Sequence, residues 1–201
     1  MSILIYAESA EGKIKKVAFE LASYAKKVAA SMGTTVTAVT INNSDNSALA
    51  GYGVDKVLNV SNDKLNNFSA KAYADVIAQA AKKEGTQIVL VSSSTDSLYL
   101  APLVAVALEA GYASNVVALP VSTSPFQVKR TAFSNKAFNI TEISTPVKVL
   151  GIAKNSFGLV EDAVSMTEEA FAPSLNDADF GIKVENVEKV TGKVTIADAE
   201  I

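Results

Sequence analysis

The chain has 201 residues, of which 49% are hydrophobic and 19% charged, a composition typical of one large globular domain or of one domain with a tail. It contains no His, no Cys and no Trp, which excludes catalytic Ser-His and Cys-His pairs, zinc sites of the usual kind, and disulfides. The net charge of −3 gives no bulk attraction to nucleic acid, so we expect no nucleic-acid partner.

The first 120 residues alternate short apolar runs with longer helical patterns. Apolar and β-branched runs predict buried strands at 2–7, 34–41, 56–60 and 87–91. Helical spacing of apolar residues predicts helices at 15–32, 48–51, 70–83 and 101–110. Gly33 suits the end of the first helix, Ser69 the N-cap of the third, and Pro102 the first turn of the fourth. This alternation predicts an α/β fold of three layers, with a mostly parallel sheet covered by helices on both faces.

The pattern changes after Gly111. Four β-rich segments follow with almost no helix between them, at 115–121, 127–133, 136–143 and 147–152. Residues 133–136 predict the tight turn of a hairpin, so we expect an antiparallel extension at the edge of the parallel sheet. Residues 153–173 are irregular and acidic, and 179–190 contain enough apolar residues for one more edge strand. A final apolar run at 194–201 suggests that more protein follows.

Ligands in folds of this class bind at the carboxyl ends of the parallel strands, near the point where the strand order reverses. The loop 8–12 after the first strand carries Glu8 and Glu11, matches neither a dinucleotide fingerprint nor a P-loop, and would repel a phosphate. The loop 92–97 is richer in donors, and its hydroxyls precede a helix N-terminus, where an anion could bind. The residues of this weak anion-site candidate are Ser92, Ser93, Ser94 and Ser97. Serines ahead of a helix are more often simple caps, and that alternative stays open.

Arg130 is the only arginine of the chain, and Lys136 lies across the predicted hairpin from it. An isolated arginine on a strand more often makes a surface ion pair than a ligand contact. A guanidinium is also the better choice for a buried or interfacial carboxylate. We therefore interpret Arg130 and Lys136 as candidates for an interface, or Arg130 for an internal role, rather than for a ligand site.

No segment predicts a membrane anchor or a metal centre. The longest apolar stretch, 100–110, is shorter than a membrane span and contains Glu109. Residues 1 and 2 lead directly into an apolar run, without the basic region of a targeting segment. No group of Asp and Glu has the spacing of a Mg²⁺ or Ca²⁺ site. We expect a cytoplasmic, bacterial-type protein with no membrane insertion and no metal.

Read in order, these segments resemble the electron-transfer flavoprotein alpha subunit family. Residues 3–8 and 12–14 are similar to its opening strand and loop, and 51–57 (GYGVDKV) resemble its "YGADKV" turn. Residues 70–80, 88–91 with 100–102, and 130–137 (RTAFSNKA) resemble its next helix, its strand and Pro-containing helix, and its "RPxYxGKA" hairpin. The chain departs from the family at 97–99, where Ser-Leu-Tyr replaces Gly-Arg-Asp, and at Leu103, where a basic residue is usual.

The resemblance implies an adenine nucleotide alpha hydrolase-like or Rossmann-like fold, with residues 1–190 as the N-terminal domain and 191–201 as a linker to an absent C-terminal FAD-binding domain. It implies an FAD-containing heterodimer with a beta subunit, which takes electrons from dehydrogenases and passes them to an acceptor. This fragment would then be an assembly domain, neither an enzyme nor itself a binder of FAD. The rival hypotheses are a stand-alone nucleotide-binding module of the universal-stress or ATP-pyrophosphatase class, based on the loop 92–97, and an interaction domain without a ligand.

Overall fold

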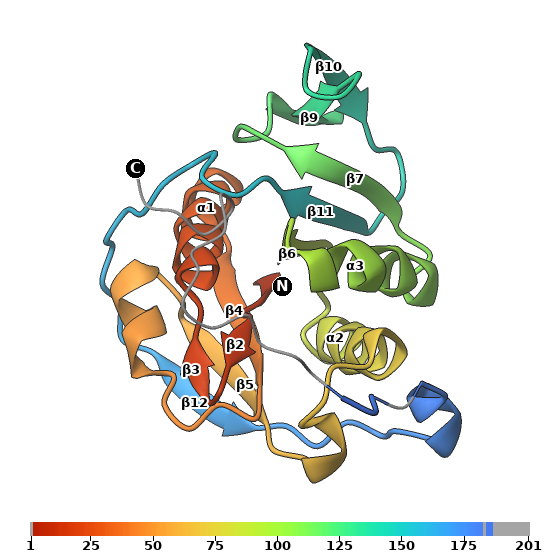
Figure 1. The fold of residues 1–201 in the computed structure, drawn as a ribbon. Coiled ribbons are helices and arrows are strands. Elements are labelled where there is room, and N and C mark those ends of the chain that lie inside the picture. Colours follow the sequence, from red (N-terminus) through yellow and green to blue (C-terminus); the bar gives the residue numbers. More distant parts are fainter. Residues whose placement is uncertain (1, 183, 187–201) are drawn as a thin grey trace, which may run out of the picture.

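The computed structural model describes residues 2–182 and 184–186 (Figure 1). It is an α/β fold built on a mostly parallel central sheet, as the sequence predicts. The strands of the main sheet are β1 (Ser2–Tyr6), β4 (Thr35–Ile41), β5 (Lys56–Val60), β6 (Ile88–Ser92), β7 (Gly111–Val116), β8 (Ser122–Thr123), β9 (Phe126–Ala132), β10 (Ala137–Glu142), β11 (Lys148–Ile152) and β12 (Thr167–Ala170). Two short strands, β2 (Ser9–Ala10) and β3 (Lys13–Ile14), form a separate ribbon after β1.

The strand order is β10-β9-β7-β11-β6-β1-β4-β5-β12, with β8 paired to β9. The strands β7, β11, β6, β1, β4, β5 and β12 are parallel to one another, whereas β9 and β10 pair in the antiparallel sense at the other edge. From β1 the chain first moves outward through β4 to β5, and then returns to β6 on the other side of β1. The strand order therefore reverses at β1, and its carboxyl end is the place where a fold of this class forms a crevice.

Helices cover both faces of the sheet (Figure 1). On one face, α1 (Lys16–Met32) packs on Ile3 and Ile5 of β1. On the other, α2 (Ala70–Lys83) and α3 (Thr95–Ala107) pack on a cluster that includes Leu4 and Tyr6. Alternate residues of β1 thus feed two separate cores, as the period of two in a strand requires. Three short 3₁₀ helices complete the described part: η1 (Ser47–Tyr52), η2 (Asp63–Leu65) and η3 (Asp177–Phe180).

Most of the predicted elements of the first 92 residues are confirmed to within two residues. Gly33 ends α1 in a left-handed conformation with φ of 64°. Ser69 occupies the N-cap position of α2, but its hydroxyl donates to the backbone oxygen of Asp179 instead of capping the helix. The short helix predicted at 48–51 is the 3₁₀ helix η1.

The prediction for α3 was wrong at its start. The helix begins at Thr95, so Pro102 lies inside it and not in its first turn. Ser94 is the N-cap, and its Oγ accepts the N–H of Ser97 at 3.1 Å. The polar residues of the first turn follow that cap, which is why the apolar pattern alone placed the start six residues too late.

The antiparallel extension predicted after Gly111 is confirmed for the hairpin, but it does not include all four of the β-rich segments. The hairpin of β9 and β10 is antiparallel as predicted, and Phe133, Ser134 and Asn135 form its turn with positive φ. However, β7 starts at Gly111 rather than at 115, and β11 inserts between β6 and β7, parallel to both. Burial on both faces of the sheet explains the nearly continuous apolar run of β11, a signature of parallel strands.

The acidic segment 153–173 is not wholly irregular, because it contains β12 at the far edge of the sheet, parallel to β5. Glu169 of β12 pairs with Lys56 at 2.7 Å and with Lys83 at 2.8 Å, and the hydrogen bonds from these two lysines lower the pKa of Glu169 to about 2. The described residues of the predicted edge strand 179–190 contain no strand. The run 194–201 and the boundary between 190 and 191 lie outside the described residues.

Candidate functional site

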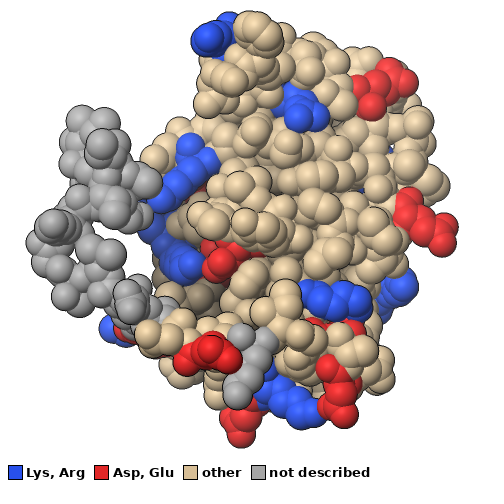
Figure 2. Space-filling view, turned by 45° about the vertical axis from the view of Figure 1, so that its right-hand side comes forward, with Lys and Arg blue, Asp and Glu red and all other residues tan. Residues whose placement is uncertain are grey.

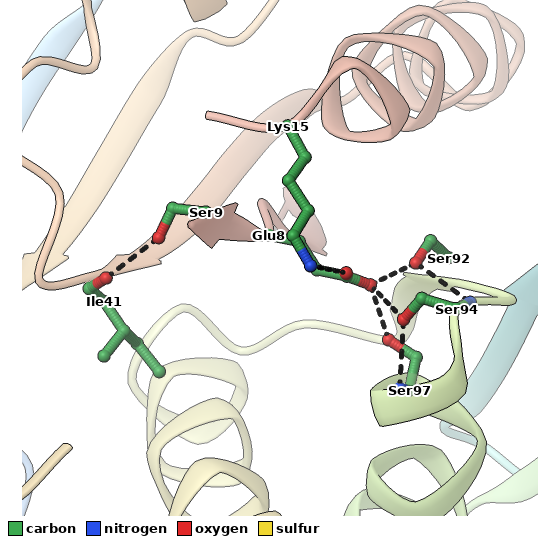
Figure 3. Close-up of polar contacts among 7 residues, drawn as sticks. All are labelled: Glu8, Ser9, Lys15, Ile41, Ser92, Ser94 and Ser97. Carbon is green, nitrogen blue, oxygen red and sulfur yellow. Dashed lines mark hydrogen bonds and ion pairs between the residues drawn. The ribbon is translucent and has the colours of Figure 1, made fainter. Parts of the chain in front are cut away.

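The candidate site lies where the strand order reverses, at the carboxyl ends of β1 and β6 (Figure 3). Glu8 follows β1 by two residues and is only 2% exposed. Ser92 ends β6, Ser94 caps α3, and Ser97 lies in the first turn of α3. Parallel pairing of β1 with β6 brings these segments together, although they are more than 80 residues apart in sequence.

The carboxylate of Glu8 accepts hydrogen bonds from three of the predicted serines (Figure 3). Its Oε1 accepts from the Oγ of Ser92, from the Oγ of Ser94 at 2.6 Å and from the Oγ of Ser97 at 2.8 Å. Its Oε2 lies 3.3 Å from the Nζ of Lys15, the residue before α1. One buried carboxylate thus joins β1, β6 and α3, with a lysine at the rim.

The hydrogen bonds decide the charge state of Glu8. Burial alone would raise the pKa of this carboxyl group. The hydrogen bonds from Ser92, Ser94 and Ser97, together with the charge of Lys15, outweigh burial and lower the pKa below its ordinary value of 4.5. Glu8 is therefore ionised at neutral pH, and its charge lies beside the positive end of the α3 dipole.

In this arrangement a carboxylate of the chain itself takes the place that a bound anion would have at the serine hydroxyls. Three hydroxyls and a helix N-terminus are the donors that a phosphate would use, and a carboxylate of the same chain accepts from them. The expectation that Glu8 only repels phosphate missed this role. The signal in the sequence was the pairing of an acid after one buried strand with a serine cluster after another.

The same edge of the sheet carries a cleft of about 260 Å³ beside Glu8. Its walls come from the ends of β1 and β4, the ribbon β2–β3, the segment before α2, and the first turns of α2 and α3. Glu8, Glu11 and Asp96 line it, with Lys15 as the one cationic residue in its lining. A dinucleotide pyrophosphate needs donors and positive charge, so the residues at this edge do not fit FAD.

Ser93, the fourth predicted serine, points elsewhere. Its Oγ is buried with no hydrogen-bond partner in the described part of the chain, and it lies close to Gly151 of β11. Arg130 of β9 approaches the same region, because its Nη2 donates to the Oγ of Ser114 at 3.1 Å and Ser114 also neighbours Gly151. The Nε of Arg130 is likewise buried without a partner among the described residues. The structure thus separates Ser93 from the other three serines and places it near Arg130.

Lys136 lies at the tip of the hairpin, away from both groups. Its Nζ is 5.8 Å from the ring centroid of Phe133, which is exposed like the next aromatic residue, Phe138. The Nζ of Lys129 lies 4.3 Å from the ring centroid of Phe138. The two strands of this hairpin therefore present aromatic rings with lysines beside them to the surface.

A second buried carboxylate, that of Glu20 in α1, organises the loop after β11. Its Oε1 accepts the N–H groups of Phe157 at 2.9 Å and of Gly158 at 3.1 Å. Its Oε2 accepts the N–H of Asn155 at 2.9 Å. Periodicity places Glu20 on a helix but does not reveal a loop 135 residues later, so sequence reasoning missed this contact.

The helix α3 presents an unusual surface. Beyond its polar first turn the helix is apolar on all sides, yet Leu98, Tyr99, Leu103 and Val106 are exposed. Figure 2 shows a broad area without Lys, Arg, Asp or Glu, with charged side chains around it. A helix that is apolar all round normally has neighbours on every side, so this face favours contact with other protein.

None of the described helices is long and apolar enough to cross a bilayer. Likewise, no three acidic residues converge in the described part of the chain as ligands of a metal ion.

Residues 3–178 match the electron transfer flavoprotein domain family. The chain is 27% identical to the electron transfer flavoprotein subunit alpha of Thermoanaerobacterium thermosaccharolyticum, and the match covers 99% of this chain and 63% of that protein. It is 28% identical to the subunit of the same name from Megasphaera elsdenii, and the match covers 99% of this chain and 62% of that protein. It is 30% identical to the lactate dehydrogenase (NAD(+),ferredoxin) subunit LctC of Acetobacterium woodii, and the match covers 72% of this chain and 36% of that protein. The chain thus spans less than two thirds of the length of these relatives.

Proposed function

The chain belongs to the electron transfer flavoprotein family, and from this premise we propose that it is the N-terminal assembly domain of an alpha subunit. In this proposal it forms part of a heterodimer that contains FAD, takes electrons from dehydrogenases and delivers them to an acceptor. The match over residues 3–178 and the relatives named as electron transfer subunits support it. The chain itself is not an enzyme but a part of the carrier.

We further propose that FAD binds to polypeptide outside this chain. The carboxylate of Glu8, held by Ser92, Ser94 and Ser97, is the observation that carries this proposal. It occupies the position where a phosphate would otherwise meet the N-terminus of α3, and a second anion there would be repelled. The same contact weighs against a stand-alone nucleotide-binding module, because that function needs these hydroxyls for phosphate.

We propose that the beta subunit docks on the hairpin of β9 and β10. All of β10 except Thr141 is exposed, and Phe138 and Ile140 project apolar side chains from it. The edge of β10 has no neighbouring strand among the described residues, and an unpaired edge is a template for another chain. Lys136, in the turn of this hairpin, would meet a carboxylate of the partner, whereas the side chain of Arg130 donates to Ser114 within the sheet.

The test is an absorbance spectrum. The purified 201-residue chain is incubated with excess FAD, passed through a gel-filtration column and scanned through the visible flavin bands. We expect no stoichiometric flavin with the chain, and one flavin per chain would overturn the proposed division of labour. Calorimetry with ATP and AMP tests the rival nucleotide module, which requires micromolar binding that Ser94→Ala weakens.

A further inference from the structure

The cleft beside Glu8 has a wall of aromatic rings. Tyr6 of β1 and Tyr73 of α2 meet edge to face, with ring centroids 6.1 Å apart. Phe68, in the segment before α2, meets Tyr73 edge to face at 5.0 Å. All three residues line the cleft, together with the apolar Ile41 and Leu65. The faces of aromatic rings attract a cation once it is taken out of water.

The polar groups of the cleft next to this wall are mainly acceptors. Asp96, in the first turn of α3, is half-buried, and its carboxylate makes no hydrogen bond or ion pair within the described residues. Among the residues that the structure describes, the Oε2 atom of Glu8 pairs only with Lys15, whose side chain lies at the rim and is 39% exposed. Glu11 adds a third acidic residue at the mouth.

The hydroxyl of Tyr6 is a polar group of the cleft that can bind a ligand. The residue is 6% exposed, it lines the cleft, and its hydroxyl has no hydrogen-bond partner among the described residues. The hydroxyl is not among the buried unpaired side-chain atoms of the described residues, so it reaches the open space of the cleft. This hydroxyl is therefore available to a group that enters the cleft.

The titration of the tyrosines agrees with this geometry. Burial raises the pKa of Tyr6 most, and the neighbouring Tyr73, Glu8 and Asp96 raise it further. Burial and then the charge of Asp96 raise the pKa of Tyr73 to about 12. Both carboxylates thus lie close enough to act on the aromatic wall, which stays neutral at physiological pH.

We propose that this cleft binds a guanidinium group. The group donates five hydrogen bonds in one plane, which suits the carboxylate of Asp96, the hydroxyl oxygen of Tyr6 and the free lone pairs of Glu8. Its flat face can stack on the aromatic wall. The carboxylates of Glu8 and Asp96 disfavour an anion in the cleft, and Lys15 at the rim pairs with Glu8. The proposal does not depend on the family's electron-transfer role.

The probe is butylguanidinium, with butylurea as an uncharged compound of nearly the same shape. Each is titrated into the 201-residue chain while the NMR amide shifts of residues 6, 8, 73 and 96 are followed. We expect butylguanidinium to bind with a Kd of about 1 mM, a value typical of a single small group. Butylurea should bind at least about tenfold more weakly, which corresponds to ~1.4 kcal/mol.

Two substitutions test the residues. Asp96→Asn keeps the shape of the side chain and removes its charge, and it should raise the Kd for butylguanidinium about tenfold. Glu109→Gln removes the same charge at an exposed position just beyond the far end of α3 and should leave the Kd within twofold. Tyr6→Phe removes only the hydroxyl and should raise the Kd about threefold. Thermal melts check that each variant is folded. If Asp96→Asn does not fold, the Kd of Tyr6→Phe for butylguanidinium decides whether the proposal holds.

Equal binding of butylurea and butylguanidinium would overturn the proposal, as would an unchanged Kd in a folded Asp96→Asn variant or no shift up to 50 mM ligand. A blocked Ala-Arg-Ala peptide then identifies the source of the group. Binding at least as tight as that of butylguanidinium assigns it to an arginine of a protein. Binding of the free compound alone assigns it to a small molecule.

Discussion

The Oγ atom of Ser97 lies 2.8 Å from Oε1 of Glu8, across 89 residues of sequence. This hydrogen bond ties the first turn of α3 to the loop after β1, on the two sides of the point where the strand order reverses. Ser92 and Ser94 donate to the same oxygen, so three hydrogen bonds to Glu8 link the two segments of the fold. Its charged acceptor makes each bond stronger than one between neutral groups.

Glu8→Gln should therefore destabilise the protein. The amide oxygen can still accept from the three serines in place of Oε1, but it is uncharged and accepts more weakly. The NH2 group then takes the place of Oε2 and faces Lys15 with a donor where the carboxylate had an acceptor. We expect the free energy of unfolding, measured by urea titration, to fall by about 1–3 kcal/mol. Glu161→Gln, at an exposed position, is the matched control and should change it by less than ~0.5 kcal/mol. An equal effect of the two substitutions would show that the hydrogen bonds to Glu8 contribute nothing to the free energy of unfolding.

The stability difference between wild type and Glu8→Gln should depend on pH. The pKa of Glu8 is lowered in the folded protein, so the unfolded chain binds its proton more readily. The stabilisation from ionised Glu8 is then complete above its ordinary pKa of 4.5 and is lost as the pH falls through the lowered folded value. Urea titrations from pH 7 to pH 3 should show the two proteins converging at the acid end. A difference that grows on acidification would contradict this sign.

Sequence reasoning reached the sheet and its helices because β1, β4, β5 and β6 are short apolar runs bounded by turn residues. It located β11 in the sequence but not in the sheet, because an apolar run does not show that its strand inserts between two strands that precede it in the chain. It named Ser92, Ser94 and Ser97 as candidates for an anion site, but not the carboxylate of Glu8 that accepts from them. Glu8 belongs to another βα unit, and only the strand order brings the two loops together.

Glu20→Gln should loosen the loop after β11 without disturbing the sheet. Three N–H groups of that loop converge on the carboxylate, and an amide can accept at only one of its two atoms. We expect amide hydrogen exchange of residues 155, 157 and 158 to accelerate by about ten- to a hundredfold, equivalent to ~1.4–2.8 kcal/mol of local opening. Exchange in β1 and β6 should rise far less. Uniform acceleration across the whole chain would instead indicate global destabilisation.

Phe138→Asp should separate assembly from folding. The ring is 62% exposed and contacts Lys129, so its loss should change the free energy of unfolding by less than ~0.5 kcal/mol. If the beta subunit docks on the hairpin as we propose, a charge at this position should weaken co-purification with that subunit at least about tenfold, since truncating a central aromatic residue of an interface costs ~2 kcal/mol or more. Lys64→Asp, on η2, is a control outside the hairpin. Undiminished co-purification of Phe138→Asp would place the docking surface elsewhere.

Gly111→Ala should destabilise the protein because the start of β7 has no room for a side chain. A Cβ at this position would lie 2.4 Å from Cγ2 of Ile143 and 2.7 Å from Oγ1 of Thr145, closer than real atoms approach. That hydroxyl also accepts the N–H of Gly111 at 2.7 Å, so any shift that relieves the clash disturbs this bond. We expect a loss of about 1–3 kcal/mol by urea titration, the usual cost of overpacking. Gly51→Ala, where a Cβ meets nothing within 4 Å, is the matched control and should leave stability unchanged within ~0.5 kcal/mol. Equal stability of the two variants would mean that β7 and the 143–145 segment can move apart freely.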